Sequence, residues 1–318
     1  MSEPLEILTV GRIGVDLYPE QIGVPLPEVR TFRKMLGGSP TNVAVAAARL
    51  GRRAGVITKV GADPFGEYAR VALHGFGVDP SRVGTHPTLR TPLVFCEIFP
   101  PDNFPLLFYR EPKAPDLELE PADLDLDEIA AVPLFWTTGT GLSQEPSRST
   151  TLLALRARPR GLITVHDLDH RPMFWSSEEE ACRWAREALA CATVAVGNLG
   201  ECAVAVGRRS PDETAKALLD FGVELAVVKL GPDGVLAARR HESVRVPPIP
   251  VEVVNGLGAG DAFGGALCHG LLAGWELERL ISFANAAGAL VATRLGCADD
   301  MPTFAEVEEL LEAAQRER

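Results

Sequence analysis

The chain has 318 residues, 46% of them hydrophobic, and a formal net charge of −12. A chain of this length buries roughly 75% of the surface that its unfolded form exposes, so a core can form without disulfides or metals. Nucleic acids and anionic membrane surfaces are normally bound by clusters of Lys and Arg, and the sequence contains none. The composition therefore excludes a general nucleic-acid or membrane-surface binder and is typical of a folded, acidic protein.

Cysteine usage and hydropathy indicate the compartment. The six cysteines are scattered, without the close spacing of a zinc site or the density of a secreted disulfide scaffold. No apolar run reaches the roughly 18 residues that a membrane span needs, and the sequence opens without a basic region followed by an apolar one. We therefore expect a cytoplasmic protein with free thiols.

Short β-branched runs alternate with longer helical patterns along most of the chain. Buried strands are predicted at residues 5–10, 54–60, 134–138, 162–166, 194–197 and 225–230. Helices are predicted at residues 40–50, 64–76, 147–157, 177–190, 212–221, 259–273 and 277–295. Because parallel strands need crossover connections, this alternation predicts an α/β fold with a mainly parallel sheet that is covered on both faces.

Two segments lack this alternation. Residues 15–35 and 90–112 are rich in Pro and extended-type residues, and the second contains a predicted hairpin around Pro100-Pro-Asp-Asn. They predict a small β lid beside the main sheet. Because no linker is long enough to divide the chain, we expect a single domain over residues 1–318.

The strongest local signal is the glycine-rich turn at residues 255–260, which opens onto an apolar helix. Such a turn exposes backbone N–H groups, and the helix N-terminus adds about half a positive charge, so this site favours an anion. Asp261 lies in the first turn of that helix. It is either a capping acid that favours the helix dipole or a general base beside a phosphate site, where it would accept the proton of an attacking hydroxyl.

Other catalytic motifs are absent from the sequence. There is no G-x-x-x-x-G-K-[ST], no G-x-G-x-x-G after the first strand, and no G-x-S-x-G. The pair His166 and His170 resembles a metal cluster, but its position at a strand end favours another role.

A second glycine turn feeds a helix at residues 37–44. The two turns, in this order, are similar to the N- and C-terminal signatures of the ribokinase-like (PfkB-type) carbohydrate kinase family. Supporting matches are Gly11 with Asp16, residues 61–66, residues 198–201 and residues 229–234. The chain is identified as a member of this family over essentially its full length. The resemblance implies a ribokinase-like three-layer sandwich, with a mainly parallel central sheet and a small β lid, that uses ATP and Mg²⁺.

The resemblance also implies a role for each matching residue. Asp261 would be the catalytic base, and Gly258, Ala259 and Gly260 would form the anion hole. Asp16, Gly38 and Asn42 would hold hydroxyls of the sugar. Asn198 and Glu201 would organise Mg²⁺ and phosphate, Glu201 through water. Lys229, Gly231 and Gly234 would line the nucleotide cleft, with Asn285 near the adenine.

Each of these residues also has a plainer interpretation. Asn198 could cap a helix, Glu201 could be a solvated first-turn acid, and Asp16 could end a strand. One position departs from the family pattern. Many members carry Asp-Thr, linked to a monovalent cation, where this chain has Asn255-Gly256. A potassium requirement is therefore left open.

Residues 107–111 and 166–175 are similar to family members that phosphorylate sugar acids. A carboxylate is suited to a bidentate guanidinium, which Arg110 and Arg171 could supply. The plainer interpretation is a solvated hairpin charge and a surface salt bridge. Residues 11–17, 37–42 and 296–303 most resemble members that act on 5-dehydro-2-deoxygluconate in inositol breakdown. The alternative acceptor is 2-dehydro-3-deoxygluconate.

The resulting hypothesis is an ATP-dependent kinase that phosphorylates the primary hydroxyl of a keto-deoxy sugar acid. A nucleoside kinase would share both signatures but would have no use for Arg110 and Arg171. A non-catalytic sugar or nucleotide sensor would not need Asp261. The expected partners are the sugar acid and ATP, without nucleic acid or membrane, and strands of the lid could pair two chains into a homodimer.

Overall fold

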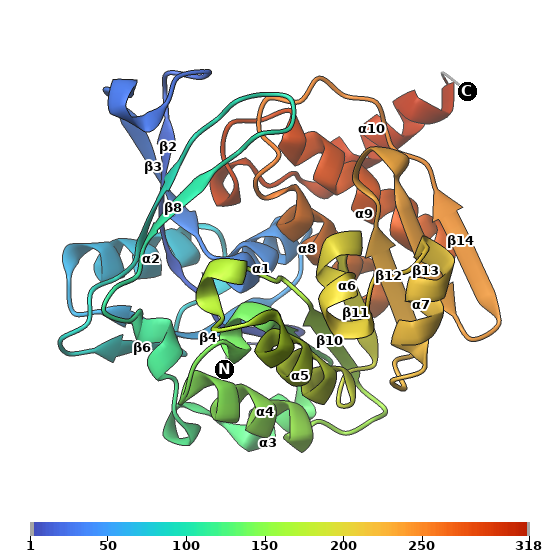
Figure 1. Cartoon of the computed structure of the whole chain (residues 1–318), viewed down its shortest axis with the longest axis horizontal. Helices are drawn as coiled ribbons and strands as arrows, with labels where there is room; N and C mark the ends of the chain where they lie inside the picture. Colours follow the sequence, from blue (N-terminus) through green and yellow to red (C-terminus); the bar gives the residue numbers. More distant parts are fainter. Residues whose placement is uncertain (1–2, 317–318) are drawn as a thin grey trace.

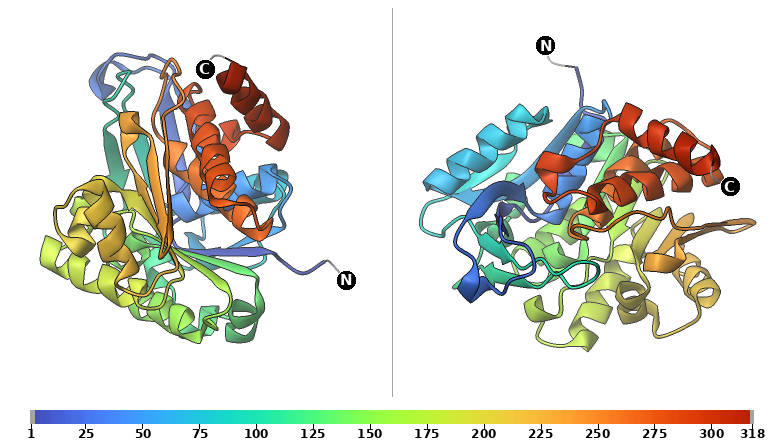
Figure 2. Two further views of the ribbon diagram at one scale, coloured as in Figure 1. Left: turned by 90° about the vertical axis from the view of Figure 1, so that its right-hand side faces the viewer. Right: turned by 90° about the horizontal axis from the view of Figure 1, so that it is seen from above.

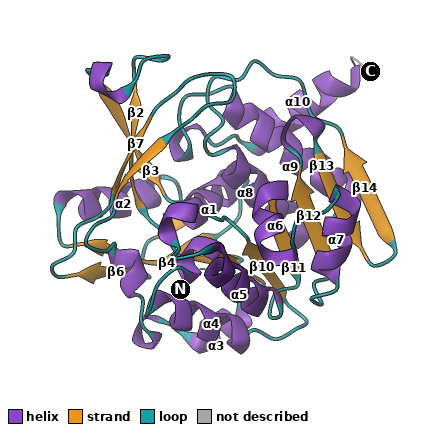
Figure 3. Cartoon of the chain, viewed as in Figure 1, coloured by secondary structure: helices purple, strands orange, loops and turns teal. Residues whose placement is uncertain are grey.

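Two sheets organise the chain (Figures 1 and 3). The computed structural model describes residues 3–316. Two residues at each end of the range expected to form a single domain, 1–318, therefore lie outside the described residues. Residues 1 and 2 belong to the N-terminal sequence in which we expect no signal peptide. The larger sheet has ten strands and the smaller one four. The arrangement of the elements around each sheet follows from the need to bury the apolar side chains of its strands.

The larger sheet contains all six predicted strands, within two residues of their predicted bounds. They are β1 (Ile7–Val10), β4 (Ala54–Gly61), β9 (Leu134–Thr138), β10 (Ile163–Asp167), β11 (Val194–Asn198) and β12 (Leu225–Lys229), paired in parallel in the order β12-β11-β10-β9-β1-β4. Short strands β5 (Val78–Asp79) and β6 (Val83–His86) also pair with β4. An antiparallel hairpin that we did not predict, β13 (Val235–Arg239) and β14 (Glu242–Val246), extends the other edge.

Helices cover both faces of this sheet (Figure 2). One layer holds α1 (Ser39–Arg49), α2 (Pro64–Gly75), α8 (Ala259–Leu272), α9 (Leu277–Ala292) and α10 (Phe304–Arg316). The other holds α3 (Leu126–Ala131), α4 (Ser147–Ala157), α5 (Glu178–Leu189), α6 (Leu199–Val206) and α7 (Pro211–Leu219). Strand β12 shows the reason, because Leu225 and Val227 join the first core while Ala226 and Val228 join the second. The predicted three-layer α/β fold is confirmed; α3, α6 and α10 were not predicted.

The smaller sheet is built from the two segments that lack helical periodicity. Its strands, in the order β3-β2-β7-β8, are β3 (Phe32–Gly37), β2 (Gly14–Pro19), β7 (Leu93–Cys96) and β8 (Leu106–Tyr109). The β7–β8 pair is the predicted hairpin. Because side chains alternate along a strand, Val94, Leu106 and Phe108 face the pocket described below, while Leu107 and Tyr109 are exposed.

The six cysteines all lie within the described residues and all are free thiols. Across residues 3–316, no helix combines the length and the apolar character that crossing a bilayer requires.

Candidate active site

The predicted site residues gather where the parallel strands end. Asp167, Asn198 and Lys229 are the last residues of β10, β11 and β12, and the N-terminus of α8 faces the same edge. Carboxyl ends of strands are the usual place for a ligand in α/β sheets, because the loops that follow them are free to carry polar groups.

A pocket lies between this edge and the smaller sheet. Its lining contains all five residues predicted to bind the acceptor and the predicted base: Asp16, Gly38, Asn42, Arg110, Arg171 and Asp261. These residues come from β2, the start of α1, the end of β8, the loop after β10 and α8. Segments that are up to 245 residues apart in the sequence therefore form one concave surface.

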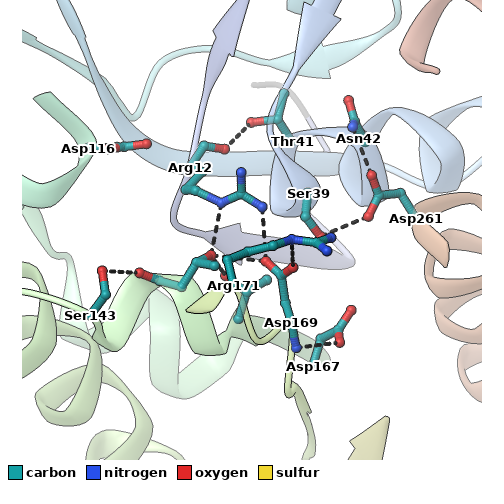
Figure 4. Close-up of polar contacts among 12 residues, drawn as sticks. Arg12, Ser39, Thr41, Asn42, Asp116, Ser143, Asp167, Asp169, Arg171 and Asp261 are labelled. Atoms are coloured by element: carbon teal, nitrogen blue, oxygen red, sulfur yellow. Dashed lines mark hydrogen bonds and ion pairs between the residues drawn. The ribbon is translucent and has the colours of Figure 1, made fainter. Parts of the chain in front are cut away.

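The carboxylate of Asp261 is held by two donors from α1 (Figure 4). The Ser39 hydroxyl donates to Oδ1 and the Asn42 amide donates to Oδ2, each at 2.8 Å. Burial raises the pKa of Asp261 above its ordinary value, although these two hydrogen bonds oppose the rise. Asn42, which we expected on a sugar hydroxyl, uses its amide N–H to hold the Asp261 carboxylate.

The turn before α8 has the geometry of an anion site. Gly258 caps the helix with φ of 84°, a conformation that favours glycine, and a Cβ there would lie 2.3 Å from Cys297 Sγ. The ammonium of Lys229 lies 3.3 Å from where a Cβ on Gly260 would stand. Burial alone would lower the pKa of Lys229, but Asp167 and nearby carboxylates raise it, so the side chain stays cationic at the helix N-terminus.

The pair Gly37-Gly38 gives two pocket residues their room. A Cβ on Gly37 would lie 2.1 Å from Asp16 Oδ1, and a Cβ on Gly38, where φ is 103°, would lie 2.4 Å from the carbonyl oxygen of Arg12. Burial raises the pKa of Asp16 to about 7, against the lowering effect of Arg12. The two glycines of this signature are needed because the Asp16 carboxylate and the Arg12 carbonyl lie too close to their backbone for a side chain.

The two predicted guanidinium groups are held by buried carboxylates. Arg110 pairs with Asp116 at 2.6 Å, and the Arg110 side chain is only 10% exposed. Arg171 Nε lies 3.1 Å from Oδ1 of Asp169, which is 4% exposed. The plainer interpretation of Arg110 as a solvated hairpin charge is therefore wrong, since this side chain reaches inward to the pocket.

A second groove runs along the ends of β11 and β12. Three of the predicted nucleotide residues, Asn198, Lys229 and Gly231, line it together with Asp233 and Arg245. Gly234 and Asn285 do not belong to its lining. A Cβ on Gly234 would meet the carbonyl oxygen of Val246 at 2.1 Å, so this glycine allows the β13–β14 pairing, and the Asn285 amide donates to the carbonyl of Pro247.

Comparison with known proteins identifies the family. Residues 5–304 match the pfkB family carbohydrate kinases. The chain belongs to this family. This kinase is 35% identical to the 5-dehydro-2-deoxygluconokinase of Geobacillus kaustophilus (strain HTA426), over 98% of this chain and 95% of the relative.

Solved structures share the fold over nearly the whole kinase. The ATP-bound fructokinase from Xylella fastidiosa superposes with a TM-score of 0.85 at 26% identity, covering 97% of this chain and 98% of that one. A double mutant of the fructokinase from Vibrio cholerae O395, in the fructose, ADP and potassium ion bound form, gives 0.84 at 27% identity, covering 98% and 100%. The family and its named members make this chain an ATP-dependent sugar kinase.

Asn198 and Glu201, the residues predicted to organise Mg²⁺, lie together at the start of α6. Across residues 3–316, no three His, Cys, Asp or Glu side chains are grouped closely enough to hold a metal by themselves. Glu201 and Asn198 form a reciprocal cap on α6, in which Glu201 Oε2 accepts the Asn198 N–H at 2.7 Å. The cap interpretation of Asn198 is correct, and Glu201 keeps its second oxygen for a ligand. Mg²⁺ commonly binds through one or two carboxylates, phosphates and waters.

Several residues of the kinase's pocket were missed by sequence reasoning. Arg12, Ser39 and Cys297 line it, while Asp116 and Phe174 contact Arg110 and Asp169 contacts Arg171. Ser39 stands inside the N-terminal signature, and Arg12 stands between Gly11 and Asp16, so both were within reach of a motif-based search. Phe174 and Cys297 lie inside the segments 166–175 and 296–303 that resemble sugar-acid kinases, but neither residue was singled out there, and Asp116 carries no local signal.

Proposed function

We propose that this kinase transfers the γ-phosphoryl group of ATP to the primary hydroxyl of 5-dehydro-2-deoxygluconate, a step that would belong to inositol breakdown in the cytoplasm, where ATP is available. The observation that carries the acceptor class is the presence of Arg110 and Arg171 in the same pocket as Asp261. Guanidinium groups recognise a carboxylate, and the Geobacillus relative carries this acceptor in its name. The alternative acceptor is 2-dehydro-3-deoxygluconate.

Each group of residues in the pocket has a separate role in the phosphoryl transfer. Asp261, oriented by Ser39 and Asn42, accepts the proton of the acceptor hydroxyl as the phosphorus is attacked. The N–H groups at Gly258–Gly260 and the Lys229 ammonium bind the charge on the phosphoryl oxygens. Asn198 and Glu201 would hold Mg²⁺, which supplies further charge neutralisation at the phosphates. The smaller sheet closes the pocket as a lid and excludes water, which would otherwise hydrolyse ATP.

An acceptor panel tests this function. ADP release is measured with both keto-deoxy sugar acids, with fructose and ribose, and with adenosine. We expect turnover with a sugar acid at a kcat/KM well above that of every neutral acceptor. Preference for adenosine or a neutral sugar would contradict the acceptor class, and ATP binding without turnover on any acceptor would indicate a sensor.

Replacing Arg110 should weaken binding of the acceptor but not binding of the nucleotide. Arg110→Met removes a charge-assisted contact to the acceptor carboxylate, so KM for the sugar acid should rise about 10- to 100-fold while KM for ATP changes little. Steady-state kinetics with each substrate varied in turn measures both values. Arg156→Met, at a 59% exposed ion pair, is the control. Equal rises in the two KM values would contradict the carboxylate assignment.

Asn255 supports a kinase that works without potassium. This residue is fully buried; its amide donates to the Leu295 carbonyl at 2.7 Å and its oxygen accepts the Leu257 N–H at 3.0 Å. The amide thus satisfies a buried carbonyl, and a cation is not needed there. We expect kcat to stay within about twofold when potassium is replaced by tetramethylammonium, a change too small to signal a lost buried interaction. Asn255→Asp would face that carbonyl with a buried negative charge, so its activity should fall without potassium and recover with it.

The outer face of the lid supports a homodimer. Phe32, Phe95 and Tyr109 pack edge to face at 5.3 and 5.4 Å, and the neighbouring Leu107 is 48% exposed. Such an apolar patch is typical of a protein contact. Light scattering should show a dimer that Leu107→Lys dissociates and Val71→Lys, at an exposed position of α2, does not. A monomeric wild-type protein at micromolar concentration would contradict this proposal.

A further inference from the structure

We propose that Arg12 is a third acceptor-binding residue and that it makes the kinase select acceptors with a negative charge. This inference rests on the proposed function and deepens it, because that function uses only Arg110 and Arg171. Arg12 follows β1 and lines the same pocket, although it is only 8% exposed.

Two contacts fix the guanidinium of Arg12. Its Nη2 lies 3.0 Å from Asp169 Oδ2, and its Nε donates to Thr140 Oγ1 at 2.9 Å. Thr140 in turn donates to the same carboxylate oxygen at 3.0 Å. A long side chain held in this way loses little further freedom when a ligand binds. Arg12 is therefore oriented before the acceptor arrives.

These contacts leave a donor for the ligand. Among residues 3–316, Nη1 of Arg12 makes no hydrogen bond, while Nη2 and Nε are used on the side of Asp169 (Figure 4). Because the guanidinium is planar and its bonded edge faces Asp169, the remaining nitrogen is directed away from that carboxylate. A guanidinium N–H that lines a pocket without a protein partner can bind an anionic or carbonyl oxygen of a ligand.

Arg12 also belongs to one cluster with the other two guanidinium groups. Asp169 forms ion pairs with Arg12 through Oδ2 and with Arg171 through Oδ1, so a single carboxylate lies beside both guanidinium groups. The guanidinium carbons of Arg12 and Arg110 lie 5.7 and 5.3 Å from the centre of the Phe174 ring. Three guanidinium groups thus converge around Phe174 and Asp169, and we place the acceptor carboxylate there, with its hydroxyl end at Asp261.

Arg148 is a structural, ion-paired arginine elsewhere in the chain, and it matches Arg12 in most of its contacts. Arg148 pairs with Glu180 at 2.7 Å, lies 4.8 Å from the Trp184 ring centre and is 12% exposed, much as Arg12 is. Its Nε donates to the Leu142 carbonyl and its Nη2 also to the Ser143 carbonyl, and it does not line the pocket. Arg148→Met is therefore a matched control for loss of a buried, stacked and ion-paired arginine.

The test compares a charged acceptor with a neutral one. Arg12→Met, Arg12→Lys and Arg148→Met are assayed with 5-dehydro-2-deoxygluconate and with its primary amide. We expect Arg12→Met to lose about 10- to 100-fold in kcat/KM for the acid and under about threefold for the amide, with a smaller loss for the acid in Arg12→Lys. Arg148→Met should change both acceptors alike. Equal losses of acid and amide in Arg12→Met would show a structural role and overturn the inference.

A binding measurement tests the role of Arg12 without relying on phosphoryl transfer. The rise in melting temperature on adding the sugar acid, without ATP, is recorded for each variant. If the wild-type protein does not phosphorylate the acid, the proposed function fails. The inference is then upheld only if acid still raises the melting temperature of the wild type and of Arg148→Met more than that of Arg12→Met, and it fails if the three rises are equal.

Discussion

Replacing Asp261 with Asn is expected to lower kcat by about 10²- to 10⁴-fold, the contribution of a positioned general base. The amide has nearly the shape of the carboxylate but cannot accept the proton of the acceptor hydroxyl. KM for ATP should change little, because the N–H groups of residues 258–260 remain in place. Single-turnover phosphoryl transfer measures the loss of the chemical step directly. A variant that keeps more than a tenth of the wild-type rate would contradict the assignment of Asp261 as the base.

The pH profile gives an independent check on Asp261. Only the deprotonated carboxylate acts as a base, so kcat/KM should rise with pH through its pKa, which burial holds above the ordinary value. The Ser39 hydroxyl stabilises the charged form and lowers that pKa. Ser39→Ala should therefore move the acid limb of the profile to higher pH. A limb that moves to lower pH, or that persists unchanged in Asp261→Asn, would show that another group is titrating.

The substitution Gly258→Ala is expected to lower kcat at least about 10²-fold, as loss of a preorganised anion donor does. The added Cβ would lie 2.3 Å from Cys297 Sγ at a residue with φ of 84°, so the turn must move and its N–H groups must turn away from the phosphoryl group. Steady-state kinetics with saturating acceptor and ATP measures the effect. Cys297→Ala in the same chain removes the nearest obstacle and should restore part of the rate.

Gly274→Ala at the other end of α8 is the matched control for Gly258→Ala. Gly274 also has a positive φ, 66°, but nothing lies within 4 Å of the position of its Cβ. Both variants bear the backbone strain of a left-handed residue, roughly 1–2 kcal/mol, and Gly258→Ala adds the overlap with Cys297, so both melting temperatures should fall and that of Gly258→Ala should fall further. Only Gly258→Ala should lose kcat. Equal losses of kcat in the two variants would mean that general destabilisation, and not the anion site, explains the effect.

Most of the larger sheet follows from local patterns in the sequence. Runs such as 54–60 and 225–230 are apolar on both sides because helices cover both faces of the sheet, so their strands are recognisable from composition alone. Helix α6 was missed because its eight residues follow directly after β11 and show no long period. The β13–β14 hairpin was missed because its edge strand β14 carries a weak apolar signal, with only Val246 of its five residues buried.

Within the site, the sequence by itself determined the residues whose chemistry depends on the local backbone. Gly258 and Asp261 are recognisable because a glycine turn and a helix N-terminus form from adjacent residues. The 318-residue length and the −12 charge excluded whole classes of partner in the same way. Only the tertiary structure decided which groups face one another: that Asn42 holds Asp261, that Asp116 turns Arg110 inward, and that Asp169 pairs with both Arg12 and Arg171. These contacts join residues that are distant in the chain, and their geometry is set by how the sheet, α8 and the lid pack together.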